Sequence, residues 1–238
     1  IVIFVFFAIP LPCPAADVAR ARQHVTRTHG TLSQKCLALN ESQFRQRDTI
    51  FMILVIGLGN PGDEYRATRH NVGREVVTAF SAAEKFPEFL FHKKWNALVS
   101  EGRAGKERLT LLLPDTLMNR SGTAAAAAAR FYKVKPAHVF VIHDDADIAL
   151  GSAKLSFNKR SAGHKGVESV MRSLKTRGFW RFRIGIAGRR DIPAEKLVLK
   201  KFTPDEQRTM KKMAKRTADA LMRAITEGPE KAMNEYNQ

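Results

Sequence analysis

Residues 52–62 read Met-Ile-Leu-Val-Ile-Gly-Leu-Gly-Asn-Pro-Gly, and this stretch establishes the fold class. The apolar run 53–56 predicts a buried strand, and the glycines and proline that follow predict a tight turn at its end. Beyond this turn, short apolar runs alternate with amphipathic segments, a pattern typical of α/β proteins. No internal repeat interrupts it, so we expect residues 52–238 to form one α/β domain.

Helical spacing and capping residues predict where the helices lie. Val72, Val76 and Val77 recur along one helix face, and the Ser121 hydroxyl is placed to cap a helix that starts at Thr123. The string Thr-Pro-Asp-Glu at 203–206 predicts a capped start with proline in the first turn. The expected helices span 71–85, 123–132, 165–175 and 204–227, and the expected strands span 52–58, 95–101, 108–113, 138–143, 152–157 and 181–186.

The charge of the chain is strongly positive and unevenly distributed. Forty Lys and Arg stand against 23 Asp and Glu, which gives a formal charge of +17 and a pI near 10.3. Between Lys154 and Arg190 there are eleven basic residues and one acid, Glu168. Such an excess indicates a polyanionic partner, either nucleic acid or an acidic membrane surface. Because the positive charge is concentrated in one stretch, the sequence favours a surface that binds a polyanion over a protein that is merely soluble and basic.

The two cysteines exclude some classes of protein. Cys13 and Cys36 form no CxxC motif and no paired framework, so neither a disulfide scaffold nor a thiolate zinc site is predicted. The absence of cysteine after residue 36 fits a reducing compartment, and we expect a cytoplasmic protein with no membrane partner.

The first 51 residues are expected to lie outside the folded domain. The apolar run 1–12 resembles the hydrophobic region of a signal peptide, but no positively charged segment precedes it and it is too short to span a bilayer. Met52 stands directly before the first expected strand. We therefore expect residues 1–51 to be a disordered extension or a mis-assigned start, with secretion as the rival interpretation.

The segment Gly57-Leu58-Gly59-Asn60-Pro61-Gly62 formally matches the GxGxxG loop of dinucleotide-binding proteins. In that fold the glycines lead directly into a helix whose amino end meets the pyrophosphate. Here residues 61–64 are turn-forming, two of them acidic, and helical periodicity resumes only at Val72. We therefore expect no nucleotide cofactor. The loop is instead expected to present Asn60 and His70 at the edge of the sheet.

His70 and Asp144 are the candidate catalytic pair. His70 precedes a helix and could be a simple capping or surface histidine, but Asp144 ends the apolar strand 139–142 and should emerge at the same edge of the sheet. A histidine held by a carboxylate keeps one tautomer, and its second nitrogen can accept a proton from water. There is no GxSxG nucleophile motif and no available catalytic cysteine. Direct attack by activated water is therefore the simplest chemistry.

Two further readings stay open at this point. His143, Asp144 and His164 or His70 could ligate a metal, but neighbouring strand residues point to opposite faces and no HxxxH spacing is present. We therefore expect no metal. Asn119 offers both a donor and an acceptor, which suits binding of a peptide bond, but it could equally be a loop residue before a helix.

Six strings, in a fixed order over about residues 52–238, resemble the bacterial peptidyl-tRNA hydrolases. They are Gly57–Gly62, Tyr65–Gly73, Thr116–Gly122, His143–Asp147, Gly163–Gly166 and Arg181–Ile186. The resemblance implies hydrolysis of the ester between a peptide and the 3′ end of tRNA. It also implies a single domain with a mixed, mostly parallel twisted sheet between helices, monomeric and without a cofactor.

The same resemblance assigns roles to individual residues. His70 is the base that activates water, Asp144 fixes its tautomer, and Asn60 helps to admit substrates whose amino group is acylated. Asn119 binds near the scissile ester, and Arg183 contacts tRNA phosphate. The cleft for the peptide and the terminal adenosine is lined by Tyr65, Leu117 and Met118.

Three positions depart from the family pattern. Lys165 stands where an asparagine usually binds substrate, and an ammonium donates but does not accept. Ser156 replaces a phosphate-binding lysine, although Lys159 and Arg160 are near enough in sequence to take over. Leu117 replaces an aromatic residue, which weakens stacking on a base. Lys165 in particular keeps open an alternative: an RNA-binding relative, such as a splicing cofactor, that has lost the chemistry.

Overall fold

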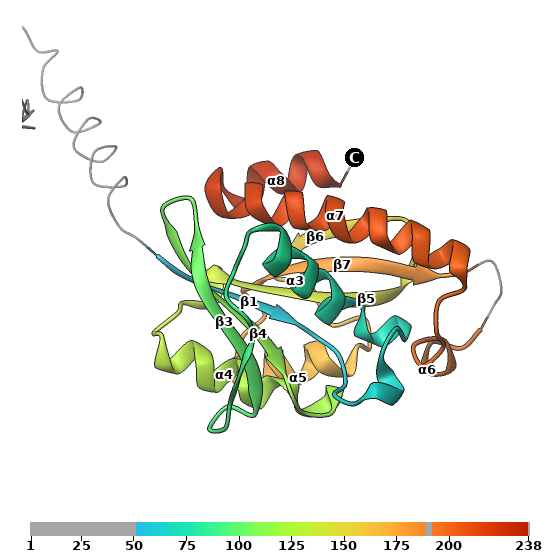
Figure 1. Cartoon of the computed structure of the whole chain (residues 1–238), viewed down its shortest axis with the longest axis horizontal. Helices are drawn as coiled ribbons and strands as arrows, with labels where there is room; N and C mark the ends of the chain where they lie inside the picture. Colours follow the sequence, from blue (N-terminus) through green and yellow to red (C-terminus); the bar gives the residue numbers. More distant parts are fainter. Residues whose placement is uncertain (1–50, 189–191, 238) are drawn as a thin grey trace, which may run out of the picture. The chain divides into compact units, whose positions relative to one another are not determined.

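Seven strands form one mixed sheet in the part of the chain that the computed structural model describes, residues 51–188 and 192–237 (Figure 1). Its strand order is β2-β3-β4-β1-β5-β7-β6. The strands are β1 (Met52–Gly57), β2 (Leu90–His92), β3 (Ala97–Ala104), β4 (Glu107–Pro114), β5 (Val139–Ala149), β6 (Ala153–Phe157) and β7 (Trp180–Ala187). The expected extension 1–51, apart from Phe51, lies outside the described residues.

The centre of the sheet is parallel and its edges are antiparallel. β1 pairs in parallel with β4 and β5, and β5 pairs in parallel with β7. The pairs β2–β3, β3–β4 and β6–β7 are antiparallel. The expected mixed α/β sheet is confirmed, but parallel pairs do not outnumber antiparallel ones among the described strands. An apolar run in the sequence does not reveal the direction of its neighbour, which is why the balance was predicted wrongly.

Helices cover both faces of this sheet (Figure 1). On one face α3 (Val72–Ala83) and α7 (Pro204–Thr226) share a core with α8 (Pro229–Tyr236). On the other face α4 (Ser121–Phe131) and α5 (Lys165–Leu174) form a second core, into which the alanine run of α4 packs tightly. A short helix, α6 (Ala194–Leu197), follows β7. No helix among the described residues combines the length and apolarity needed to cross a membrane.

Of the two predicted helix caps, the one at Thr203 is confirmed and the one at Ser121 is wrong. Thr203 caps α7 as expected: its side chain accepts from the Glu206 N–H, and the Glu206 carboxylate accepts from the Thr203 N–H. Ser121 does not cap α4. It is the first helical residue, and its hydroxyl donates to the Met118 carbonyl at 2.9 Å, closing the 3₁₀ turn Met118–Arg120.

Some elements differ from the sequence prediction. The short elements β2, α6 and α8 were not predicted, because three to eight residues carry little periodicity. β5 was expected to end near residue 143 but continues to Ala149, because β7 remains a hydrogen-bonding partner beyond the end of β1. Asp144 therefore lies within a strand, although it is two residues beyond the last residue that pairs with β1.

Candidate active site

A glycine brings the two candidate catalytic residues together. A Cβ at Gly73 would lie 2.7 Å from the Leu58 carbonyl oxygen and would collide with that of Ile142. The absence of a side chain thus lets the first turn of α3 rest directly on the ends of β1 and β5. His70 lies in the 3₁₀ turn Arg69–Asn71 just before α3, and Asp144 lies two residues after Ile142. The close approach therefore places the two side chains at one point.

His70 and Asp144 are in direct contact, as the sequence predicted. The His70 Nδ1 lies 2.9 Å from both carboxylate oxygens of Asp144. The Asp144 side chain is only 2% exposed, whereas that of His70 is 12% exposed. Because a carboxylate only accepts, the proton of this bond sits on Nδ1 of the imidazole. Nε2 is then the basic nitrogen, and it has no hydrogen-bond partner in the described part of the chain.

His164 is a third member of this cluster, and its role was not predicted. Its Nε2 lies 2.8 Å from the Asp144 Oδ1, while its Nδ1 accepts the backbone N–H groups of Gly166 and Val167 at the start of α5. Since Nδ1 accepts, Nε2 must carry the proton and donate it to Asp144. A histidine placed directly before the expected helix 165–175 was the available signal, but it indicates capping and not the partner of the second nitrogen.

A second glycine positions His164. A Cβ on Gly166 would collide with the Met118 sulfur and would lie 3.0 Å from a Leu58 methyl carbon. Glycine thus allows the amino end of α5 to approach both the loop after β1 and the turn before α4. The result is one site assembled from segments that lie far apart in the chain.

The two histidines keep Asp144 ionised. Burial alone raises the pKa of Asp144, but His164 and His70, through their charge and hydrogen bonds, outweigh burial and hold the pKa well below its usual value. His143 behaves differently. Burial, together with His164 and Arg181, lowers the pKa of His143 well below its usual value, so this ring is neutral.

The metal reading can be compared with the geometry. His143 donates from Nδ1 to the Asp144 backbone carbonyl at 2.6 Å and so turns away from the carboxylate. His70, Asp144 and His164 do present ligand atoms within 4.8 Å of one another, and they form the one such group among the described residues. The His70 Nδ1 and the His164 Nε2 each already donate a proton to the Asp144 carboxylate, and a cation would have to displace both protons. The expectation of a metal-free site remains a prediction.

A cavity of about 360 Å³ opens beside His70. Its walls come from the end of β5, the loop 161–165 and the region of α6. The lining residues are His70, Asp144, Asp145, Ala146, Asp147, Ser161, Ala162, Gly163, His164, Lys165, Ala194, Glu195 and Val198. The site therefore has room for a ligand next to the base.

Asn60 is buried and its orientation is fixed. Its Oδ1 accepts the Met118 N–H at 2.7 Å, and its backbone exchanges hydrogen bonds with the Asn71 side chain at 2.8 and 2.9 Å. Because Oδ1 is occupied, the side-chain amide of Asn60 is left to donate to a ligand. The Asn119 side chain is exposed and has no hydrogen-bond partner among the described residues. Leu117 is 54% exposed, Met118 is buried and Tyr65 is half-buried.

The expected basic face is smaller than the sequence indicated. Arg181 is only 1% exposed and donates to the Arg160 carbonyl at 2.8 Å, so it is structural. Arg183 is partly buried and pairs with Asp145 at 2.7 Å. Ser156 is buried, with a hydroxyl that lacks a partner among the described residues.

Exposed cations remain on this part of the surface. Lys159 and Arg160 are exposed, as they must be to replace a lysine at position 156. Lys165 lines the cavity, is 68% exposed on its side chain and lies 3.9 Å from Glu168, a weak ion pair. Arg189 and Arg190 lie outside the described residues.

Comparison with known proteins identifies the family. Residues 54–238 match the family model described as peptidyl-tRNA hydrolase. The chain is 42% identical over 185 residues to a peptidyl-tRNA hydrolase of Mycobacterium bovis, covering 76% of this chain and 95% of the relative. It is 38% identical over 186 residues to one of Clostridium botulinum, covering 78% and 97%.

A solved structure agrees with this assignment. The crystal structure of peptidyl-tRNA hydrolase from Acinetobacter baumannii superposes with a TM-score of 0.73 at 29% identity, covering 78% of this chain and 94% of that one. The chain therefore belongs to the peptidyl-tRNA hydrolase family.

Proposed function

We propose that this protein hydrolyses the ester between the peptide and the 3′ end of tRNA, and so recycles tRNA from prematurely released peptidyl-tRNA. The observation that carries the proposal is the imidazole of His70, which is held by an ionised Asp144 and opens on a cavity. This is the arrangement required for a general base acting on water. Membership of the family supports the choice of substrate.

The reaction proceeds by one proton relay. His70 Nε2 takes a proton from water, and the oxygen of that water attacks the carbonyl carbon of the ester. The resulting tetrahedral intermediate expels the ribose 3′-oxygen, which receives the proton from His70. Asp144 stabilises the transient imidazolium and preserves its orientation throughout. Free tRNA and the peptide acid are released, without a metal or cofactor.

The side-chain amides of Asn60 and Asn119 and the residues that line the cleft select the substrate. The Asn60 side-chain amide donates to a carbonyl of the acylated amino group, which a free aminoacyl ester lacks. Asn119 binds near the scissile ester. Tyr65, Leu117 and Met118 contact the peptide and the terminal adenosine of the CCA end.

Phosphates of the acceptor stem provide the remaining affinity. Arg183, Lys159, Arg160 and Lys165 contact these phosphates, which position the tRNA without reading its sequence. The enzyme acts as a monomer in the cytoplasm.

The decisive experiment measures release of free tRNA from N-acetylated aminoacyl-tRNA. Wild type should hydrolyse it, and His70→Ala should lose about 10²–10⁴-fold in kcat, the usual contribution of a general base, with the Kd for tRNA nearly unchanged. His138→Ala is the matched control, because His138 lies just before the first residue of β5, six residues before Asp144. Its activity should equal that of wild type.

Two alternatives give different results in the same assay. An RNA-binding relative without chemistry would bind the substrate and release no tRNA. A metal-dependent hydrolase would lose activity with chelator and regain it with a divalent ion, whereas the water-activation mechanism predicts full activity in excess chelator.

A further inference from the structure

A second groove lies at the far end of α5, separate from the cavity beside His70. It has a volume of about 680 Å³ and is lined by Asn158, Glu168, Met171, Arg172, Lys175, Thr176 and Arg177. Apart from Glu168, whose i−3 neighbour Lys165 lines the catalytic cavity, these residues have no place in the mechanism proposed above. We call this region, defined by those seven residues, the α5 groove.

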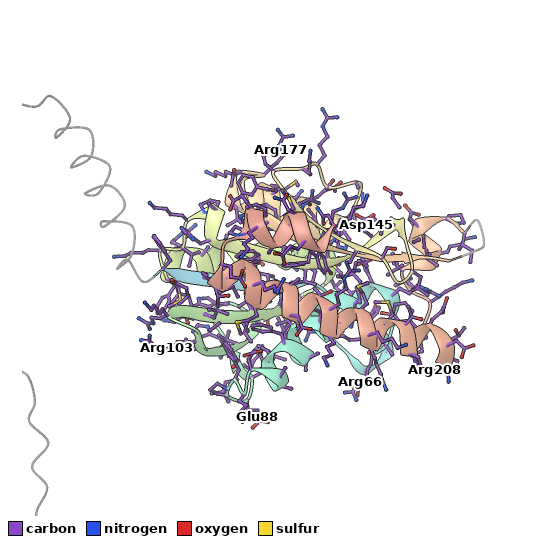
Figure 2. All side chains as sticks on the ribbon, turned by 90° about the horizontal axis from the view of Figure 1, so that it is seen from above. Arg66, Glu88, Arg103, Asp145, Arg177 and Arg208 are labelled. Carbon is purple, nitrogen blue, oxygen red and sulfur yellow. The ribbon has the colours of Figure 1, made fainter. Side chains whose placement is uncertain are left out.

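The positive charge of the α5 groove is not neutralised within the described part of the chain. Arg172, Lys175 and Arg177 are exposed, and none of them forms an ion pair there. The one acid, Glu168, is 3.9 Å from Lys165 and accepts from the Ser161 hydroxyl at 3.2 Å. Figure 2 shows Arg177 at the periphery, pointing away from the ribbon. Three unpaired cations around a hollow attract an extended polyanion.

The loop that carries two of these cations is held in one shape by its own hydrogen bonds. Lys175 adopts a left-handed conformation with φ 56° and donates from its backbone to the Arg172 carbonyl at 3.3 Å. The Thr176 N–H bonds to the Met171 carbonyl at 3.2 Å, and the Phe179 N–H bonds to the Arg177 carbonyl at 2.8 Å. A loop that is ordered before binding loses less conformational entropy when a ligand arrives.

We propose that the α5 groove binds the sugar–phosphate backbone of the tRNA acceptor arm, several nucleotides away from the ester. The inference rests on the function proposed above. Helix α5 supplies the spacing: from Lys165 at the catalytic cavity to Lys175 at the groove, ten residues at 1.5 Å each span about 15 Å. That length corresponds to roughly four or five nucleotides along one strand. Backbone contacts suit an enzyme that must accept many tRNA sequences, since phosphates carry no base identity.

The test compares one variant on two substrates. The variant combines Arg172→Gln, Lys175→Gln and Arg177→Gln. Its matched control combines Lys211→Gln, Lys212→Gln and Lys215→Gln, three exposed lysines on α7, which covers the opposite face of the sheet. One substrate is full-length N-acetylated aminoacyl-tRNA, and the other is the same ester on the trinucleotide CCA, which is too short to reach the groove.

The groove variant should raise KM for full-length tRNA about tenfold with kcat unchanged, because phosphate contacts give affinity and not chemistry. On the CCA ester it should match wild type, and the control should match wild type on both substrates. Thermal unfolding of each variant verifies that the fold is intact. An unchanged KM for tRNA, an equal change on both substrates, or an equal change in the control would overturn the proposal.

Two further measurements separate this inference from its alternatives. If wild type hydrolyses neither substrate, the proposed function fails, and the Kd for deacylated tRNA then tests the groove directly, with the same tenfold loss expected for the groove variant alone. If the variant loses binding to phosphatidylserine vesicles but keeps its affinity for tRNA, the groove belongs to a membrane surface and the proposal is wrong.

Discussion

Asp144 is the residue on which the site depends, because one buried carboxylate serves two imidazoles. It accepts from Nδ1 of His70 and from Nε2 of His164 at 2.8–2.9 Å. An ionised carboxylate can accept both protons, whereas a neutral amide accepts with one atom and donates with the other. Its charge is therefore as important as its shape.

Replacing Asp144 by Asn should lower kcat by about 10³–10⁴-fold, because the amide no longer holds the tautomer that leaves Nε2 free. The tRNA affinity should hardly change. Initial rates on N-acetylated aminoacyl-tRNA measure the loss. A variant with a tenth or more of the wild-type rate would contradict the assigned role.

The pH profile of wild type follows from the same residue. The pKa of Asp144 is held well below its ordinary value, so the carboxylate remains ionised throughout the ordinary titration range of a carboxyl group. Initial rates measured as a function of pH should therefore show no inflection near the ordinary carboxyl pKa. An inflection there would show that Asp144 is not held in this way.

At the scale of elements, the start of α5 combines a helix cap with a catalytic support. His164 accepts two backbone N–H groups of the helix and donates to Asp144 with its other nitrogen. These two tasks can be separated by substitution. Asparagine is a good capping residue, but its side chain is too short to replace the second nitrogen of histidine.

His164→Ala removes the helix cap, which should lower the free energy of unfolding by about 1 kcal/mol. It also removes the charge-assisted hydrogen bond to Asp144, which should lower kcat by about 10–100-fold. His164→Asn should recover the stability and not the rate. Denaturant unfolding and initial rates report the two effects. Should His164→Asn restore kcat as well, His164 would be a cap only and not a positioning residue.

The start of α7 holds the residue that precedes His70. Arg69 donates to both carboxylate oxygens of Glu206 at 2.7–2.8 Å and to the Ile186 carbonyl at 3.3 Å. Burial alone raises the pKa of Glu206, but hydrogen bonds from Arg69 and the Thr203 backbone lower it overall. A lowered pKa in the folded state means that the carboxylate stabilises the fold above its ordinary pKa of 4.5, and that this stabilisation is lost as the pH falls.

Glu206→Gln should therefore cost about 1–3 kcal/mol at neutral pH, since it leaves the nearly buried Arg69 unpaired. The difference from wild type should shrink below pH 4.5. Urea unfolding at several pH values measures both. Asp205→Asn is the control: its pair with Arg208 is exposed, so the cost should be below about 1 kcal/mol. A Glu206→Gln cost that does not change with pH would contradict the ion pair.

At the scale of the whole molecule, the net charge of +17 should govern encounter with tRNA. Four cations are proposed to contact acceptor-stem phosphates, and the α5 groove adds three, so log Kd should rise with log salt concentration with a slope of about 5–6. Filter binding of deacylated tRNA over a series of salt concentrations measures this slope. A flat dependence would count against phosphate contacts by the surface around α5.

The sequence by itself determined the local features of this protein. Runs of apolar residues placed the longer strands, and caps such as Thr203 placed the start of α7, because these signals depend on neighbours a few residues away. Residue chemistry also singled out His70 and Asp144, and the excess of positive charge.

Tertiary structure decided what depends on contacts between distant residues. The strand order and the direction of the edge strands are set by the sheet, not by any one strand. His164 gains its role only because close contacts at Gly73 and Gly166 bring three segments together, with His70 and Asp144 74 residues apart. Arg181 counts as a charge in the sequence but lies buried in the fold, since burial is a property of the packed chain.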